Sequence, residues 1–172
     1  MQFQKKLLIP YDAIQKRVRE LARQISIDYR GKDTVLIGML NGAVFFFSDL
    51  ALQLTVPAKI DFIRASSYGS QMISSGKVKL TKDVELSVTD KSVLIIEDIV
   101  DTGLTVSHVI SHLNTRDPES VEVCALIDKS ERREINVAVR YCGFRLKEGF
   151  VVGYGLDCNE EYRCLKDIYT LE

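Results

Sequence analysis

The sequence lacks closely spaced cysteine pairs. Its four cysteines stand apart, and no two of them form a Cys-x-x-Cys motif; they are Cys124, Cys142, Cys158 and Cys164. The only histidines, His108 and His112, are four residues apart in one predicted helix and are expected to be surface or packing residues. Because paired ligands are missing, a structural zinc site is not expected. Reduced thiols of a cytoplasmic protein explain these cysteines best.

Long hydrophobic segments are also missing. The N-terminus carries an apolar run of only three residues before Pro10, which is too short for the core of a signal peptide. The most apolar region, residues 35–56, is interrupted by Asn41, Gly42 and Asp49. It therefore fits a strand followed by a helix better than a membrane span. We expect a cytoplasmic protein that does not bind a membrane.

An excess of charge and the common nucleotide-binding fingerprints are absent as well. The formal net charge is −1, so no general basic field recruits nucleic acid or an anionic membrane. Neither the GxxxxGK[ST] motif of a P-loop nor the GxGxxG motif of a dinucleotide-binding turn occurs. Any phosphate site in this chain must therefore work without the usual lysine.

What the chain does contain is a regular alternation of predicted strands and helices over 172 residues, a length typical of one domain. Hydrophobic spacing predicts helices at 11–29, 43–54 and 105–114, and strands at 34–40, 59–66, 92–97, 121–127, 136–141 and 150–154. Residues 66–82 have little to bury and predict a mobile loop or a weak hairpin. The alternation favours an α/β fold with a mostly parallel sheet, which binds ligands beyond the carboxyl ends of its strands.

The most informative segment is residues 93–105, which read VLIIEDIVDTGLT. An apolar strand ends in the adjacent acids Glu97 and Asp98, and Asp101 follows three residues later. The loop after it precedes a predicted helix, so its backbone N–H groups, glycine and hydroxyls suit a phosphate group. The residues of this predicted phosphate cradle are Thr102, Gly103, Leu104 and Thr105.

A sugar phosphate also explains the acids beside this cradle. Adjacent carboxylates at Glu97 and Asp98 can accept hydrogen bonds from vicinal hydroxyls and hold a magnesium ion through water. Asp101 lies between these acids and the cradle, where it can act as a general base. The alternative for any single acid is a solvated strand end or a helix N-cap. The full pattern favours a ligand, because one ligand explains every position.

The same segment resembles the phosphoribosyl-diphosphate motif of the type I phosphoribosyltransferases. The resemblance continues at 40–43, 67–68, 128–133 and 150–163, where the chain is similar to the hypoxanthine-guanine phosphoribosyltransferases, and it covers nearly the whole chain. It implies a single domain with a twisted, mostly parallel sheet flanked by helices, and a core at about residues 34–150. It further implies a small hood from the N-terminal segment and about residues 155–172, and a flexible lid at about 66–83.

The activity that this resemblance implies belongs to purine salvage. The 5-phosphoribosyl group of phosphoribosyl diphosphate passes to N9 of hypoxanthine or guanine, with Mg²⁺ as cofactor and pyrophosphate as the second product. Asp101 is implied to take the proton from purine N7. Metal ligands are implied at Glu97, Asp98 and Asp157.

The resemblance assigns the leaving pyrophosphate to four residues, which are Asn41, Gly42, Arg64 and Arg163. Ser67 and Tyr68 resemble the start of the lid, which is expected to close and exclude water. Family members usually carry lysine or arginine where this chain has Asn41. Backbone amides of the loop are therefore expected to donate to the pyrophosphate without a side-chain cation.

The purine is assigned to the end of the chain that follows the predicted fourth strand. Lys129 matches the lysine that donates to the 6-oxo oxygen, and a cation there disfavours the exocyclic amine of adenine. Phe150 matches the ring that stacks on the base, Val151 the residue whose backbone meets its edge, and Asp157 lies close by at the second metal position. Arg133 is expected either to orient the lysine or to contact pyrophosphate.

Two further possibilities remain open. Within the enzyme class, the chain can prefer xanthine or adenine. Outside it, a non-catalytic regulator on the same fold would sense phosphoribosyl diphosphate and bind nucleic acid, but it would need a strong basic face that this chain lacks. Small-molecule substrates and a homodimer or homotetramer are the partners that the resemblance implies.

Overall fold

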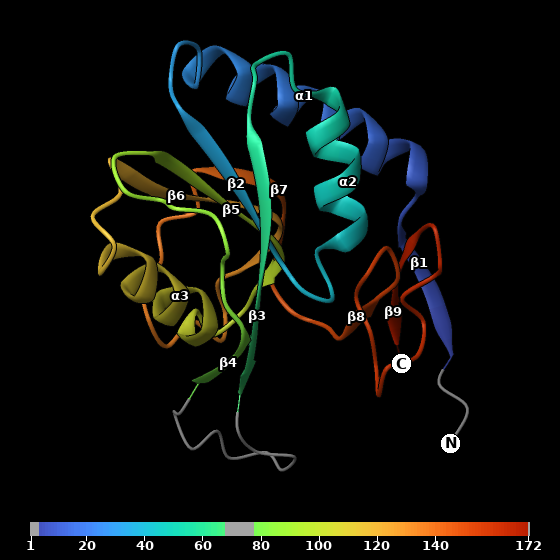
Figure 1. Ribbon diagram of the computed structural model, residues 1–172. Helices are drawn as coiled ribbons and strands as arrows, with labels where there is room; N and C mark the ends of the chain where they lie inside the picture. The colour runs from blue at the N-terminus through green and yellow to red at the C-terminus, as the bar shows by residue number, and fades with distance from the viewer. Residues whose placement is uncertain (1–3, 68–77, 172) are drawn as a thin grey trace.

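A six-stranded sheet forms the centre of the molecule, and a three-stranded sheet lies at one end of it (Figure 1). The computed structural model describes residues 4–67 and 78–171. The large sheet has the order β4-β3-β2-β5-β6-β7. Its members are β2 (Thr34–Met39), β3 (Lys59–Ser67), β4 (Val78–Lys82), β5 (Ser92–Val100), β6 (Ser120–Lys129) and β7 (Tyr141–Leu146). All neighbouring strands run parallel except β4, which pairs antiparallel with β3.

The apolar runs of the sequence become the central strands because helices cover both faces of this sheet. Helices α1 (Tyr11–Asp28) and α2 (Val44–Gln53) cover one face, and α3 (Leu104–Asn114) covers the other (Figure 1). Every residue of β2 is buried, and alternate residues serve opposite faces. Leu36 packs into the cluster under α1 and α2, while Val35 and Ile37 pack toward α3.

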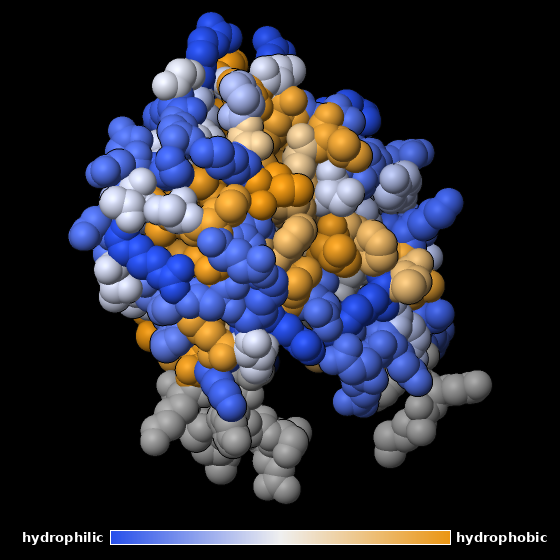
Figure 2. All heavy atoms as spheres, in the orientation of Figure 1, coloured by the Kyte–Doolittle hydropathy of each residue, from blue (hydrophilic) through white to orange (hydrophobic). Residues whose placement is uncertain are grey.

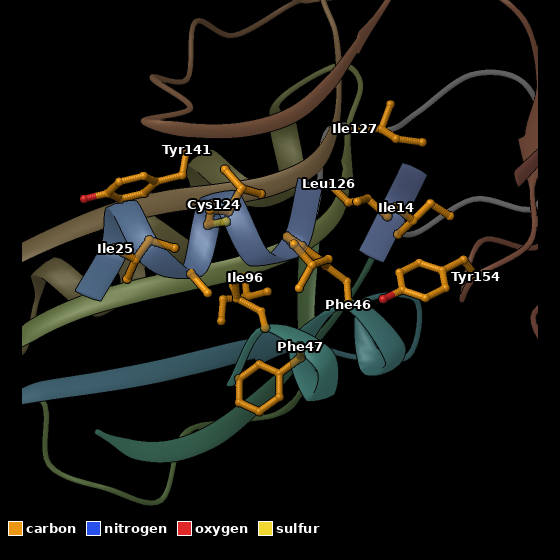
Figure 3. Packing of buried hydrophobic residues seen from close by; sticks show 14 of the residues in the cluster. Ile14, Ile25, Phe46, Phe47, Ile96, Cys124, Leu126, Ile127, Tyr141 and Tyr154 are labelled. Carbon is orange, nitrogen blue, oxygen red and sulfur yellow. The ribbon is translucent and has the colours of Figure 1, made fainter. Parts of the chain in front are cut away.

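The core under α1 and α2 is the larger of the two hydrophobic clusters. Figure 3 shows side chains of α1 and α2, such as Ile14 and Phe46, packed against Ile96 and Leu126 of the sheet. The same cluster continues to Tyr154 and to residues of the small sheet. One continuous core therefore holds both sheets together.

The small sheet, here called the hood, joins segments from the two ends of the described chain. Its order is β1-β9-β8, with β1 (Lys5–Ile9), β8 (Val151–Val152) and β9 (Ile168–Leu171). Both pairings are antiparallel. Pro10 ends β1, and α1 begins at the next residue and crosses to the large sheet. The predicted fold class, a mostly parallel sheet flanked by helices with a small hood from the terminal segments, is confirmed.

One predicted strand is wrong, and of the others, two differ most from their predicted bounds. Residues 136–141 form no strand until Tyr141, which begins β7, because the preceding segment folds back onto the loop after β5: the backbone N–H of Ile135 donates to the carbonyl oxygen of Thr102. Strand β5 continues to Val100, beyond the predicted end at Glu97. The strand predicted at 150–154 shrinks to β8, because Gly153 turns the chain with a φ of 101°.

The segment predicted as a loop or weak hairpin is described at its two ends only. There β3 and β4 pair antiparallel as the two arms of a hairpin. Ser67 is the last residue of β3, whereas Tyr68 lies outside the described residues. Within the described parts of the chain, none of the helices has the length and apolar character needed to cross a membrane.

Candidate functional site

The carboxyl ends of β2, β5 and β6 bring the predicted site residues to one edge of the large sheet. A cavity of about 110 Å³ lies at the end of β5. Ile99, Val100 and Val106 line it. So do five predicted site residues, which are Glu97, Asp101, Thr102, Gly103 and Thr105. The structure therefore gathers most of the predicted ribose-phosphate residues around one small space. Leu104 is the first residue of α3 and does not line the cavity.

The loop from Asp101 to Gly103 turns β5 into α3 through a glycine with a φ of 85°. A Cβ atom at Gly103 would lie 2.4 Å from the carbonyl oxygen of Ile135, so both the backbone conformation and the packing require glycine. The first turn of α3 leaves backbone N–H groups without partners in the helix, and that of Leu104 donates to the hydroxyl oxygen of Thr102, at 3.4 Å. Such a helix N-terminus attracts an anion.

The acid pair near the end of β5 is strongly perturbed; Asp98 is buried and Glu97 is partly exposed. Burial raises the pKa of Glu97 well above its ordinary value, and the neighbouring charge of Asp98 raises it further. Burial likewise raises the pKa of Asp98 to about 6, against the lowering effects of the Ile99 N–H group and the Arg163 charge. Placing two carboxyl groups side by side out of water costs free energy. A cation or hydroxyl donors at this position would offset that cost.

The predicted pyrophosphate loop lies directly against Asp98. The peptide bond between Leu40 and Asn41 is cis. A Cβ atom at Gly42 would lie 1.8 Å from Oδ2 of Asp98. On its other side, a Cβ atom at Gly155 would lie 1.9 Å from the carbonyl oxygen of Gly42. Two glycines thus allow the loop after β2 to sit between the acid pair and the segment that follows β8.

Asp157 and Arg163 belong to that segment and form an ion pair of 2.9 Å between Oδ1 and Nη2. The guanidinium of Arg163 also donates to the carbonyl oxygen of Gly155, at 2.7 Å. Asp157 additionally accepts the backbone N–H of Glu160. Arg64 stands apart from this group as an exposed residue of β3, although the N–H of Leu40 donates to the carbonyl oxygen of Ile63 next to it.

The carboxylate of Asp101 has one oxygen without a partner. Its Oδ1 atom is buried and forms no hydrogen bond with any described residue, whereas Oδ2 lies 3.6 Å from Nη1 of the exposed Arg132. Buried polar atoms without partners are rare in folded proteins, since each costs about 1–3 kcal/mol. The unsatisfied oxygen therefore marks a place where a donor from outside the chain would be stabilised.

A second group without a partner lies at the end of the neighbouring strand. Lys129 is the last residue of β6 and only 8% exposed, and its ammonium forms no hydrogen bond or ion pair within the described chain. Phe150 is 53% exposed just before β8, while Val151 is buried and pairs with Thr170 in the hood. The aromatic ring is thus available for stacking.

The acids at this edge suit a hydrated divalent cation better than a metal cage. Among residues 4–67 and 78–171, no three His, Cys, Asp or Glu side chains are grouped closely enough to hold a metal by themselves. Asp157, in addition, is already paired with Arg163. Mg²⁺ commonly binds through one or two carboxylates, several waters and substrate phosphates, so Glu97 and Asp98 fit it only together with a phosphorylated ligand.

Three residues that support the site were either not predicted from the sequence or not given a single role. Gly155 supports the loop at Gly42, and its sequence signal is the close repeat with Gly153. Arg132 pairs with Asp101, a contact that no spacing rule predicts. Among the described residues, Arg133 contacts neither the ammonium of Lys129 nor the pyrophosphate loop, and its side chain binds backbone carbonyls at the ends of β5 and β6.

Comparison with known proteins agrees with this geometry. Residues 10–159 match the family described as the phosphoribosyl transferase domain. The chain therefore belongs to the phosphoribosyltransferases.

Within that family, the similar relatives are named for hypoxanthine, with or without guanine. The hypoxanthine-guanine phosphoribosyltransferase of Mycobacterium avium is 44% identical over 174 residues, covering 98% of this chain and 86% of that protein. The hypoxanthine phosphoribosyltransferase of Escherichia coli K12 is 45% identical over 161 residues, covering 92% and 90%. A crystal structure of hypoxanthine phosphoribosyltransferase from Staphylococcus aureus matches with a TM-score of 0.93 at 40% identity, covering 97% of this chain and 91% of that one.

Proposed function

We propose that this chain transfers the 5-phosphoribosyl group of phosphoribosyl diphosphate to N9 of hypoxanthine or guanine, in purine salvage. The names of the relatives at 44% and 45% identity support the substrate class. The four free cysteines are compatible with a cytoplasmic enzyme.

The observation that carries this proposal is a pair of polar groups at the ends of β5 and β6 that have no partner among the described residues. Oδ1 of Asp101 is a buried acceptor, and the ammonium of Lys129 is a donor on a mostly buried side chain. A 6-oxopurine presents the complement of both groups on one edge of the ring, because its N7–H donates and its 6-oxo oxygen accepts. Adenine would turn an amine toward the lysine, so it should be a poor substrate.

In the proposed reaction, N9 of the purine attacks the anomeric carbon of the ribose as the bond to the pyrophosphate oxygen breaks. Asp101 accepts the N7 proton, which leaves a neutral purine in the nucleotide product. The transition state carries positive charge on the ribose and negative charge on the leaving group. The carboxylates of Glu97 and Asp98 lie close to where the positive charge develops, and they hold the ribose hydroxyls.

Other residues bind and shield the substrates. The backbone and hydroxyls of residues 102–105 hold the 5′-phosphate at the start of α3. Pyrophosphate is bound by the backbone amides of Asn41 and Gly42 and by the guanidiniums of Arg163 and Arg64. Phe150 stacks on the purine and the backbone of Val151 meets its edge, while the lid, which begins at Ser67 and Tyr68, excludes water.

We further propose Mg²⁺ as the cofactor. Glu97 and Asp98 would hold it through water, and Asp157 would contribute from the other side of the loop at Gly42. When bound, the ion neutralises charge on the leaving pyrophosphate.

The test is a direct assay of four bases, hypoxanthine, guanine, xanthine and adenine, with phosphoribosyl diphosphate and magnesium. Formation of IMP or GMP is expected, with little turnover of adenine. A preference for xanthine or adenine would replace the proposed specificity. Absence of turnover with every base, while phosphoribosyl diphosphate still binds, would instead favour a non-catalytic sensor.

We also propose a homodimer or homotetramer in which α2 takes part. This helix exposes Val44 and Phe45 at 39% each and Leu52 at 81%. Figure 2 shows hydrophobic residues gathered over the middle of the face where α2 lies in Figure 1. Light scattering should give two or four times the mass of one chain, and Leu52→Glu should lower it. A wild-type mass of one chain would contradict the proposal.

A further inference from the structure

Arg133 makes the most extensive set of side-chain contacts near the site. Its Nε donates to the carbonyl oxygen of Asp101 at 2.9 Å. Its Nη2 donates to the carbonyl oxygens of Val100, at 3.2 Å, and of Lys129, at 3.0 Å, and forms an ion pair with Asp128. The side chain is 15% exposed. The partners of this mostly buried guanidinium are thus backbone carbonyl oxygens and one carboxylate.

These contacts lie where two neighbouring strands end. Val100 of β5 and Asp128 of β6 are partners in the parallel ladder, and they are its last pair. Beyond this pair the two strands diverge. Asp101 enters the loop to α3, and Lys129 is the last residue of β6. The guanidinium occupies this point of separation and binds carbonyls on both sides, so it ties the two chain segments together.

We propose that Arg133 is a positioning residue that fixes the spacing between the carboxylate of Asp101 and the ammonium of Lys129. This inference rests on the proposed function, in which a single purine must meet both groups at once. Arg133 holds the main-chain carbonyl of each of these two residues. Since each side chain is attached where its backbone is held, movement of either carbonyl changes the distance that the purine has to span.

The chemistry of arginine suits this task in a way that lysine does not. A guanidinium is planar and carries five N–H donors in a rigid fork, whereas an ammonium is a compact charge on a flexible stem. Nη1 donates to the carbonyl oxygen of Val137 at 3.3 Å, which fixes the plane of the fork from a third side. Lysine would keep the charge near Asp128 but would not bind carbonyls of β5 and β6 at fixed angles.

A second set of contacts allows the positioning role to be separated from folding. The backbone N–H groups of Glu134 and Ile135 donate to the carbonyl oxygen of Thr102 at 2.9 and 3.0 Å. These bonds do not involve the Arg133 side chain. They hold the phosphate cradle in place when the guanidinium is removed, so binding of phosphoribosyl diphosphate should survive while the placement of the purine does not.

The test compares Arg133→Lys with Arg140→Lys. Arg140 is also an arginine paired with carboxylates, Glu122 and Asp28, but it lies near the start of β7 and takes no part in the proposed site. Misplacing reacting groups by about 1 Å can cost about 100-fold in rate. In Arg133→Lys we therefore expect kcat/KM for hypoxanthine to fall by roughly 100-fold, while the Kd of phosphoribosyl diphosphate changes by less than about threefold. Arg140→Lys should keep wild-type values.

A purely structural role predicts a different result. It would lower the melting temperature of Arg133→Lys and the fraction of active enzyme, but leave the KM for the purine and the preference for hypoxanthine over adenine unchanged. Wild-type KM, kcat and base preference in the folded variant would overturn the proposal. If Arg133→Lys does not fold, Arg133→Gln keeps a planar group but has only two N–H donors, too few for the carbonyl bonds to both β5 and β6. A raised purine KM with unchanged phosphoribosyl-diphosphate affinity in this variant supports the role, and unchanged kinetics overturn it. Absence of turnover in the wild-type protein would instead refute the proposed function.

Discussion

The carboxylate of Asp98 is packed against the α-carbon of Gly42, so that a Cβ atom there would lie 1.8 Å from Oδ2. Asp98 lies near the end of β5 and Gly42 follows β2, and these two strands are neighbours in the sheet. The contact joins the acid pair to the predicted pyrophosphate loop. Neither element can shift without the other.

This packing predicts the effect of Gly42→Ala. The added methyl group must displace Asp98 or the loop, so affinity for phosphoribosyl diphosphate should fall by at least about tenfold, or ~1.4 kcal/mol. Isothermal titration measures this loss. Gly31→Ala is the matched control, because Gly31 has a φ of 78° but no atom within 4 Å of an added Cβ. It should lower stability by roughly 1 kcal/mol and leave affinity unchanged. Equal affinities in the two variants would contradict the prediction.

Asp101→Asn tests the general base. The amide cannot take a proton, so kcat should fall by about 10²–10⁴-fold, whereas the Kd of phosphoribosyl diphosphate should change by less than about threefold. Steady-state kinetics and equilibrium binding separate the two quantities. Comparable losses in both would make Asp101 a binding residue.

Lys129→Ala tests base selection. Without the ammonium, the ratio of kcat/KM for adenine to that for hypoxanthine should rise by about tenfold or more. Because the ammonium of this mostly buried side chain forms no ion pair within the described chain, its removal should not lower the melting temperature. Lys59→Ala, at an exposed lysine near the start of β3, serves as the control. An unchanged ratio would refute the contact with the 6-oxo oxygen.

Asp61→Asn tests the base of the hairpin formed by β3 and β4. Burial raises the pKa of Asp61, but N–H groups of Leu86, Phe62 and Glu85 and the charge of Lys82 outweigh it, and the pKa lies below its ordinary value of 3.8. A lowered pKa contributes stability that is present above pH 3.8 and lost as pH falls through the folded value.

In urea unfolding at pH 7, Asp61→Asn should therefore cost about 1–3 kcal/mol relative to wild type. The difference should narrow as the pH drops below 3.8. Glu148→Gln, at an exposed carboxylate after β7, should show neither effect. A difference that stays constant with pH would show that the charge of Asp61 is not what stabilises the hairpin.

The parts of the fold that could be predicted from the sequence are those with strong local signals. The apolar run before Glu97 identifies β5, and the residues from Asp101 to Thr105 identify the turn into α3, because both depend on neighbours in the chain. Helix α1 is likewise visible from its spacing of buried residues and from Pro10 at its start.

The parts that could not be predicted depend on contacts between distant segments. Residues 136–141 are apolar enough for a strand, but the preceding turn is held on Thr102 and only Tyr141 reaches the sheet. Strand β1 gains its structure from β9, more than 150 residues away in the chain, so no local pattern reveals it. In the same way, the partners of Arg133 are carbonyl groups, which every residue carries and which no sequence motif records.

The order of strands in the hood has a consequence for biosynthesis. Its middle strand, β9, follows every other strand in the chain, although its partner β1 precedes them all. As the chain emerges from the ribosome, the large sheet can assemble while β1 still waits for residues 168–171. The phosphate cradle, which residues 134–135 hold at Thr102, can therefore form before the segment with Gly155 and Arg163 is secured over the pyrophosphate loop.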